Sequence, residues 1–260
     1  FPNLMIGAGL RLDVERTELH YIQKDGSPAA IALKTDTVYP TLDAHEWMPR
    51  FSVTYQMENG SIYAVAAKGY KTGGFNSIAE RPEDLRFDSE NSWNYELGYK
   101  FQSFNGFIHG DVALFYIDWR HQQIYQTIPS GRGSMIKNAG HSRSQGFELS
   151  LTSKPIYGFD FQLGYGFTDA KFLKYEVNAN LNYDDKVIPY APKNTMMAQV
   201  NKQIGLKGFA GIDYLRMNLT YRGAGRIYWA ESNDNDQRYY GLMDRSEERR
   251  VGKECRSRWS

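Results

Sequence analysis

Long apolar stretches and cysteine are what this 260-residue sequence has least of. No run approaches the about 18 consecutive apolar residues that a membrane-spanning helix needs, so no such helix is predicted within these residues. Cys255 is the only cysteine, so no disulfide can form within the chain. The first residues lack the charged and apolar segments of an export signal, and the chain does not begin with Met.

Aliphatic residues are also scarce relative to aromatic ones. The apolar fraction is 41% and the mean hydropathy is −0.59, both low for a packed soluble domain. Aromatic residues nevertheless make up 15% of the chain, with 19 Tyr and 14 Phe. A sheet with one apolar and one wet face can be polar on average and still rich in aromatic side chains. The composition therefore favours a two-faced β structure over a globular core.

The end of the chain differs in character from the rest. Residues 245–260, RSEERRVGKECRSRWS, resemble the in-frame translation of a sequencing adapter over their whole length. They hold six of the 31 basic and three of the 30 acidic residues, so residues 1–244 carry 25 basic and 27 acidic side chains. We therefore expect a domain at 1–244 followed by an artefact tail at 245–260. The slightly acidic remainder gives no support for nucleic-acid binding.

Alternation of apolar and polar residues is the strongest pattern in the sequence. Between residues 92 and 102 the apolar positions are Trp93, Tyr95, Leu97, Tyr99 and Phe101, and the positions between them are Asn94, Glu96, Gly98 and Lys100. Residues 4–14, 147–152 and 159–168 alternate in the same way. Successive side chains of a strand lie on opposite faces, so these segments predict long strands with one apolar and one polar face.

About ten strands are predicted from this alternation and from the turn residues between them. They are expected near 4–20, 49–57, 61–71, 91–103, 106–121, 135–153, 158–172, 193–204, 209–222 and 237–244. Short connections near 57–60, 103–106, 154–158 and 205–208 alternate with long ones near 21–48, 72–90, 122–134, 173–192 and 223–236. In an up-and-down meander this order places the short turns at one end of the sheet and the long loops at the other.

The asymmetry of the connections separates two kinds of β protein. Bacterial outer-membrane barrels have short periplasmic turns and long extracellular loops, and about 9–11 residues of each strand span the membrane. Soluble strands run to about 5–6 residues, and a soluble β-sandwich has no reason to segregate loop length. The predicted fold class is therefore all-β, an antiparallel up-and-down transmembrane β-barrel fragment. A soluble β-sandwich binding module is the alternative.

A series of short motifs resembles the barrel of TonB-dependent outer-membrane receptors. The first is Gly69-Tyr70 followed by Gly73-Gly74-Phe75-Asn76, and the second is Tyr95-Glu96 with Gly98 and Lys100. Residues 113–119, 138–140, Gly146-Phe147-Glu148 and 189–192 continue the series in the family's order. Each motif alone is weak, whereas the ordered series across residues 49–204 is specific. Gly73 and Gly74 are expected to supply positive φ where a strand enters a loop.

The resemblance implies a larger protein than this chain contains. Members of the family have a barrel of about 22 strands, an N-terminal plug domain and a short segment that contacts TonB. The chain is therefore expected to be the C-terminal half of the barrel, with the plug, the export signal and the terminal strands missing. The implied location is the outer membrane of a Gram-negative bacterium, in contact with outer-membrane lipids.

The resemblance also implies a function, which is import of a scarce, bulky nutrient energised through the TonB complex. A ferric siderophore is the expected ligand; haem, cobalamin and glycans remain open because their importers share this barrel. A passive porin-like channel is the alternative within the membrane. An outer-membrane enzyme lacks support, because the sequence has no H-E-x-x-H, C-x-x-C or G-x-S-x-G motif. No catalytic residue, cofactor or resident metal is predicted.

Six residues in the long connections are candidates for contact with the ligand. His121 and His141 flank one long loop, and imidazole is a ligand for iron and haem. Arg132 lies within that loop, and Arg226, Tyr228 and Trp229 combine charge with stacking surface in another. The motif residues are instead expected to build the barrel wall. They are Gly69, Tyr70, Gly73, Gly74, Phe75, Asn76, Tyr95, Glu96, Gly98, Gly146 and Glu148.

Overall fold

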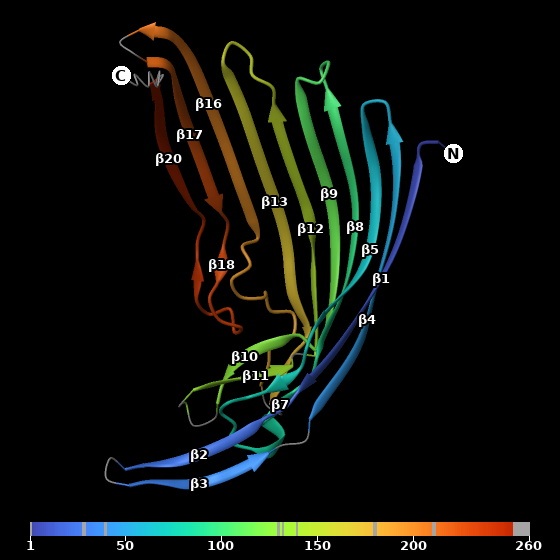
Figure 1. The fold of residues 1–260 in the computed structure, drawn as a ribbon, viewed down its shortest axis with the longest axis vertical. Helices are drawn as coiled ribbons and strands as arrows, with labels where there is room; N and C mark the ends of the chain where they lie inside the picture. The colour runs from blue at the N-terminus through green and yellow to red at the C-terminus, as the bar shows by residue number, and fades with distance from the viewer. Residues whose placement is uncertain are drawn as a thin grey trace, which may run out of the picture.

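A single antiparallel sheet of ten long strands dominates the structure, a computed structural model that describes residues 2–27, 30–38, 41–128, 131, 133–138, 140–178, 181–209 and 212–251 (Figure 1). The strands are β1 (Leu4–Thr17), β4 (Leu42–Met57), β5 (Gly60–Lys71), β8 (Glu90–Ser103), β9 (Ile108–Arg120), β12 (His141–Ser153), β13 (Phe159–Lys174), β16 (Asn194–Phe209), β17 (Ile212–Ala224) and β20 (Tyr240–Val251). Each pairs with the next long strand along the chain, which confirms the predicted meander. The sheet is curved, and β1 and β20 form its edges (Figure 1).

The long connections are more structured than the sequence predicts. Each of the five contains a small two-stranded sheet. These pairs are β2 (His20–Ser27) with β3 (Ala30–Val38), β6 (Gly74–Phe75) with β7 (Arg86–Phe87), β10 (Gln123–Thr127) with β11 (Ser134–Asn138), β14 (Glu176–Asn178) with β15 (Leu181–Asn182), and β18 (Ile227–Tyr228) with β19 (Asp236–Gln237). A 3₁₀ turn, η1 (Pro82–Asp84), lies between β6 and β7. All five pairs lie at the end of the sheet opposite the short turns (Figure 1).

Two predicted strand boundaries are wrong at the loop end. β4 begins at Leu42 rather than near residue 49, because its pairing with β1 continues as far as Thr17. Alternation in polarity is lost there, since Asp43 and His45 occupy positions on the otherwise apolar face. The predicted strand 135–153 is divided into β11 and β12, because β11 pairs with β10 while β12 pairs with β9 and β13.

The short turns include one that the sequence misplaces. Between β8 and β9, Asn105 and Gly106 have φ of 56° and 76°, the left-handed conformation for which an Asn-Gly pair is suited. The turn predicted at 205–208 is wrong, because β16 continues through these residues to Phe209.

The last strand, β20, extends beyond the predicted 237–244 and pairs with β17 as far as Val251.

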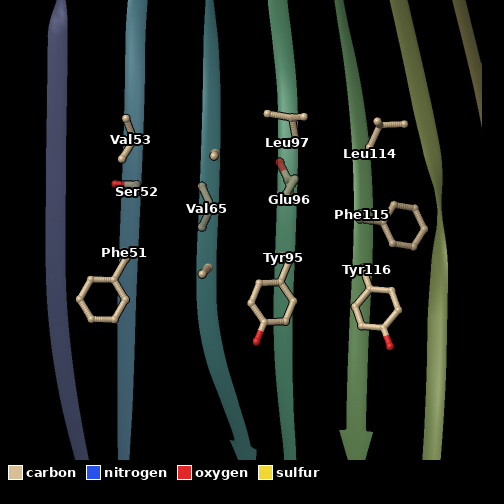
Figure 2. Close-up of a pocket in the computed structure, with 12 residues that line it drawn as sticks. Phe51, Ser52, Val53, Val65, Tyr95, Glu96, Leu97, Leu114, Phe115 and Tyr116 are labelled. Atoms are coloured by element: carbon tan, nitrogen blue, oxygen red, sulfur yellow. The ribbon is translucent and has the colours of Figure 1, made fainter.

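One face of the sheet is apolar and uncovered. Leu97 is 50% exposed, Phe161 45% and Ile6 75%, and no second sheet covers this face among the described residues. Phe51 and Val53 on β4 and Leu97 on β8 line a hollow of about 470 Å³ in this face. Figure 2 shows these side chains on their strands. In a β-sandwich these side chains would fill a closed interior, so the sandwich alternative does not describe this chain.

The opposite face is polar and joined by side-chain hydrogen bonds. Asn201 on β16, only 5% exposed, donates to Asp160 Oδ1 on β13 at 2.6 Å. The same Asn201 accepts a hydrogen bond from Asn218 Nδ2 on β17 at 2.7 Å. Thr220 Oγ1 donates to Asn218 Oδ1 at 2.9 Å. Three strands are thus bridged by a network in which buried polar groups are paired rather than left unsatisfied.

The second family motif encloses a tyrosine of the neighbouring strand on this polar face. Tyr63 on β5 stands opposite Gly98 on β8, and its hydroxyl donates to Glu96 Oε1 at 2.6 Å. The Lys100 ammonium lies 5.6 Å from the Tyr63 ring centroid. A Cβ at Gly98 would overlap the Tyr63 ring. The glycine therefore provides the space that lets the ring reach the carboxylate.

Replacing Gly98 by Val is expected to displace Tyr63 and break its bond to Glu96. Overpacking costs about 1–3 kcal/mol, so the midpoint of urea unfolding of the complete protein should fall. Gly164→Val is the matched control, because a Cβ there meets only Met197 at an ordinary 4.0 Å. Equal midpoints for the two variants would contradict this account of the motif.

Candidate ligand-binding region

The loops at one end of the sheet pack into a layer rather than extending separately. Asn76, 5% exposed, donates to the carbonyl oxygens of Asp84 at 2.7 Å and Ile136 at 2.9 Å. Its Oδ1 accepts the Ile136 amide hydrogen at 2.7 Å. The Lys137 ammonium pairs with the buried Asp84 carboxylate at 2.9 Å. Asn76 of the family motif thus fixes the loop at 72–90 against the β10–β11 hairpin.

A small hydrophobic core holds a third loop to the same layer. Phe172 and Tyr175, at the end of β13, are buried and their rings meet at 4.9 Å between centroids. Ile124 of β10 packs against this pair. Burial raises the pKa of the Tyr175 hydroxyl to about 12, so it stays neutral and accepts a hydrogen bond from Gln126. Because Phe172 lies on the polar-face side of β13, opposite Ser142, the layer covers that side of the sheet.

The fourth and fifth long connections meet beside this core. Asn233 donates to the Val187 carbonyl at 2.9 Å and accepts its amide hydrogen at 2.7 Å. Tyr190 and Trp229 form an edge-to-face pair with centroids 5.5 Å apart. Both rings remain accessible, with Tyr190 69% and Trp229 39% exposed. The loops therefore present an aromatic surface on a fixed backbone.

A cationic pocket of about 370 Å³ is lined by the end of β13 and by residues of these two connections. Its wall includes the side chains of Lys171, Lys193, Arg226 and Tyr228, and one carboxylate, Asp169. Tyr228 and then Asp236 raise the pKa of the Arg226 guanidinium, which stays charged. Groups of this kind bind anions.

Two charged residues of the pocket, Asp169 and Lys171, lie on the apolar-face side of β13. Phe167, Asp169 and Lys171 alternate along β13, so they share one face, and Phe167 pairs with Phe147 of the apolar set. The Lys193 ammonium lies 5.7 Å from the Phe167 ring centroid, on that same side. These three charged side chains thus adjoin Phe167 at the loop-side end of the apolar face.

The predicted cluster of Arg226, Tyr228 and Trp229 is divided by this geometry. Arg226 and Tyr228 line the pocket, whereas Trp229, one residue farther along, pairs with Tyr190. Trp229 follows the end of β18 at Tyr228, so its ring lies with the fourth long connection rather than in the pocket lining. Sequence reasoning missed Lys171, Lys193 and Tyr190, because they are distant in sequence from residues 226–229 and join them only through loop packing.

The histidine hypothesis receives no support from the placement of His141. Its imidazole pairs with the Asp118 carboxylate, and Asp118 stands opposite Trp93 on the apolar-face side. His121 is exposed, with φ of 54°, and its amide donates to Gly140 at 3.2 Å. Arg132 lies outside the described residues. Across the part of the chain that is described, no group of three or more His, Cys, Asp or Glu could hold a metal ion.

The glycines of the family motifs serve close packing rather than positive φ. Gly73 and Gly74 do not adopt positive φ, which corrects the sequence expectation. A Cβ at Gly73 would lie 2.6 Å from the Phe87 carbonyl oxygen, and one at Gly74 would lie 2.8 Å from the Phe87 ring.

The remaining motif residues belong to the strands. Gly69 approaches the Ser92 hydroxyl, and a Cβ at Gly146 would overlap the Phe167 carbonyl. Tyr70 pairs with Asn91 in the register of β5 and β8. The Phe75 ring lies 5.4 Å from the Arg86 guanidinium. Tyr95 lies on the apolar face, and Glu148 lies on the polar face. Phe75 lies in the loop pair β6–β7 and not in the ten-stranded sheet, whereas Gly69, Tyr70, Tyr95, Gly146 and Glu148 lie in its long strands.

Comparison with known proteins identifies the family. The model of the family described as "TonB dependent receptor-like, beta-barrel" matches residues 1–246. The chain belongs to this family, whose members are transport receptors of the Gram-negative outer membrane and not enzymes. Among the described residues no helix is both long and apolar enough to cross a membrane.

Two curated relatives match part of the chain. A probable TonB-dependent siderophore receptor, PiuA of Acinetobacter baumannii, is 26% identical over 180 residues, covering 66% of this chain and 22% of PiuA. The metal-pseudopaline receptor CntO of Pseudomonas aeruginosa is 29% identical over 129 residues, 49% of this chain and 17% of CntO. The chain thus spans about a fifth of the length of these relatives.

Solved structures share the fold at lower identity. The ferric yersiniabactin uptake receptor FyuA of Yersinia pestis has a TM-score of 0.75 at 20% identity, over 95% of this chain and 35% of FyuA. The ferric citrate transporter FecA has a TM-score of 0.73 at 15% identity, over 97% of this chain and 36% of FecA. The copper transporter OprC matches with a TM-score of 0.70 at 12% identity, covering 96% of this chain and 38% of OprC, so the fold alone does not define a substrate.

Proposed function

We propose that this chain forms part of the barrel wall and the extracellular loop layer of an outer-membrane receptor that imports a ferric siderophore, energised through TonB. The observation that carries the proposal is the loop layer over the polar face, which presents the exposed pair Tyr190 and Trp229. Rigid aromatic surfaces supply contact area at low entropic cost and suit a large planar or chelated ligand. The names of the relatives, a siderophore receptor and a metal-pseudopaline receptor, favour a metal chelate.

The two faces of the sheet suggest how the wall is oriented. The apolar face would contact outer-membrane lipids, and the polar face would line the lumen. The loop layer would then be extracellular and the short turns periplasmic, as in bacterial barrels. The plug and the segment that contacts TonB would lie in parts of the receptor outside this chain, which spans 35% of FyuA.

Replacing Trp229 by Ala in the complete receptor is expected to weaken ligand binding about tenfold, the equivalent of about 1.4 kcal/mol. The assay measures binding of a ferric catecholate, a ferric hydroxamate, ferric citrate, haem and cyanocobalamin to the purified receptor. A ferric siderophore should bind, and its uptake by cells, unlike its binding, should stop when the proton gradient is collapsed.

Tyr157→Ala is the control for this experiment, because Tyr157 is 92% exposed at the opposite end of the sheet. It should leave binding unchanged. Binding of haem or cobalamin alone would refute the siderophore assignment. Uptake that survives collapse of the gradient would refute TonB energisation and favour the passive channel.

A lysine at Leu97 should hinder insertion of the receptor into the outer membrane. Leu97 lies in the middle of the apolar face, and a lysine near the bilayer midplane costs about 2–4 kcal/mol. Ser150→Lys is the matched control, because Ser150 lies on the polar face opposite Asp111. The measurement is the amount of folded receptor recovered in outer-membrane fractions. Equal recovery of the two variants would show that the apolar face does not meet lipid.

We also propose that residues 245–260 are foreign to the barrel domain and replace the continuation of its last strand after residue 244. In β20, Arg245 and Glu247 stand opposite Leu219 and Met217 of the apolar face, so alternation fails from residue 245 onward. Charges at these positions would enter the membrane. Reading the chromosomal gene across residue 244 should give a strand with apolar residues at 245 and 247. Recovery of the same RSEERR sequence would refute this proposal.

A further inference from the structure

The cationic pocket lies at a boundary between two environments on one side of the sheet. Along β13, Phe167 belongs to the apolar surface and stacks on Phe147 at 6.0 Å between centroids. The next two residues on that side, Asp169 and Lys171, line the pocket. Lys193 is fixed over the Phe167 ring, so its ammonium group lies where the apolar surface ends. Apolar surface and cations therefore adjoin within a few residues.

The charges at the pocket do not cancel. Lys171, Lys193 and Arg226 line it, and Arg143 stands beside Lys171 in the sheet register. Two carboxylates oppose these four cations. Asp169 is engaged by Arg143 at 3.4 Å, and Asp236 is engaged by Arg226 at 3.2 Å. An excess of about two positive charges remains, which matches the about −1.5 to −2 charge of a phosphate monoester.

We propose that this pocket binds the phosphate group of a membrane lipid whose acyl chains lie along the apolar face. The inference rests on the proposed membrane location, because the site adjoins the loop-side end of the apolar surface. The lysine ammonium groups and the Arg226 guanidinium donate to the phosphate oxygens, and Phe167 and Phe147 contact the first methylene groups of the chains. Basic pockets at membrane surfaces bind lipid head groups through this combination of charge and apolar contact.

The pocket adjoins the proposed siderophore surface, since the Tyr190 amide donates to the carbonyl oxygen of Tyr228 at 2.9 Å, but Lys171 and the loop core lie on different sides of β13. Phe172, next to Lys171 in the chain, points to the polar-face side and is buried in the loop layer. Lys171 points to the other side of the same strand. A lipid bound by Lys171 would therefore lie on the apolar-face side of β13, and the loop core around Phe172 lies on the polar-face side.

The test measures which lipid the complete receptor retains. The purified receptor is equilibrated in detergent micelles with dioleoyl phosphatidic acid or dioleoyl phosphatidylcholine, and bound lipid is counted by native mass spectrometry. Wild type should retain phosphatidic acid at least about tenfold more tightly, and added salt should weaken this retention. The double variant K171Q/R226Q should lose about tenfold in affinity for phosphatidic acid, and Lys193→Gln should lose part of it.

Lys174→Gln is the matched control, because Lys174 lies on the same strand, pairs with Glu176 at 3.4 Å and does not line the pocket. It should bind phosphatidic acid like the wild type. Equal retention of the two lipids by wild type, or unchanged retention by both pocket variants, would overturn the proposal. Glycerol 3-phosphate that competes at the same concentration as phosphatidic acid would show a soluble-phosphate site and would also overturn it.

The siderophore-binding assay on the same preparations distinguishes this proposal from the proposed function. If the receptor binds the nutrient but shows no lipid preference, only the lipid-site proposal is refuted. If the receptor retains phosphatidic acid selectively but binds none of the nutrients, the siderophore assignment is refuted and the lipid-site proposal is supported.

Discussion

Each long strand of this protein has to satisfy two environments at once, with alternate side chains on an uncovered apolar face and on a polar one. The constraint follows from backbone geometry, since successive side chains of a strand point to opposite sides. Among the described residues the sheet has no second layer over its apolar face, so stability comes from backbone pairing and cross-strand contacts rather than from a central core. The buried pair Phe172 and Tyr175 lies at the loop end, outside the main wall.

Close approach between strands explains why glycine recurs in the family motifs. Gly98 faces the Tyr63 ring, and Gly146 faces Phe115 and the Phe167 carbonyl. In both cases a large ring of one strand lies over a position without a side chain in its neighbour. This arrangement places aromatic rings on the polar face without widening the sheet, and it orients Tyr63 toward Glu96. The second motif therefore determines how β5 and β8 pack, and this packing positions the Glu96 carboxylate through its hydrogen bond to Tyr63.

The end of β13 shows how one strand can serve two surfaces. Phe172 anchors the loop layer on the polar-face side, and the aromatic pair Tyr190 and Trp229 belongs to the same set of loops. Lys171 contributes to the cationic pocket on the other side. The proposed nutrient surface and the proposed lipid site would therefore both depend on the position of the end of β13. Hydrogen bonds of Asn76 and Asn233 hold the loops of this layer together.

The sequence alone determined the number of long strands, their order and the division of each into an apolar and a polar face, because these depend on period-two patterns within short segments. It also placed the long connections, but the hairpins within them were not predicted. Four of the five pairs have strands too short to leave a periodic signal, whereas β2 and β3, with eight and nine residues, were missed as strands. Only the tertiary structure decided that β4 begins at Leu42, that Arg226 lines the pocket while Trp229 contacts Tyr190, and that Lys171 and Lys193 join Arg226. Those outcomes depend on register and on contacts between loops far apart in the chain, which no local pattern encodes.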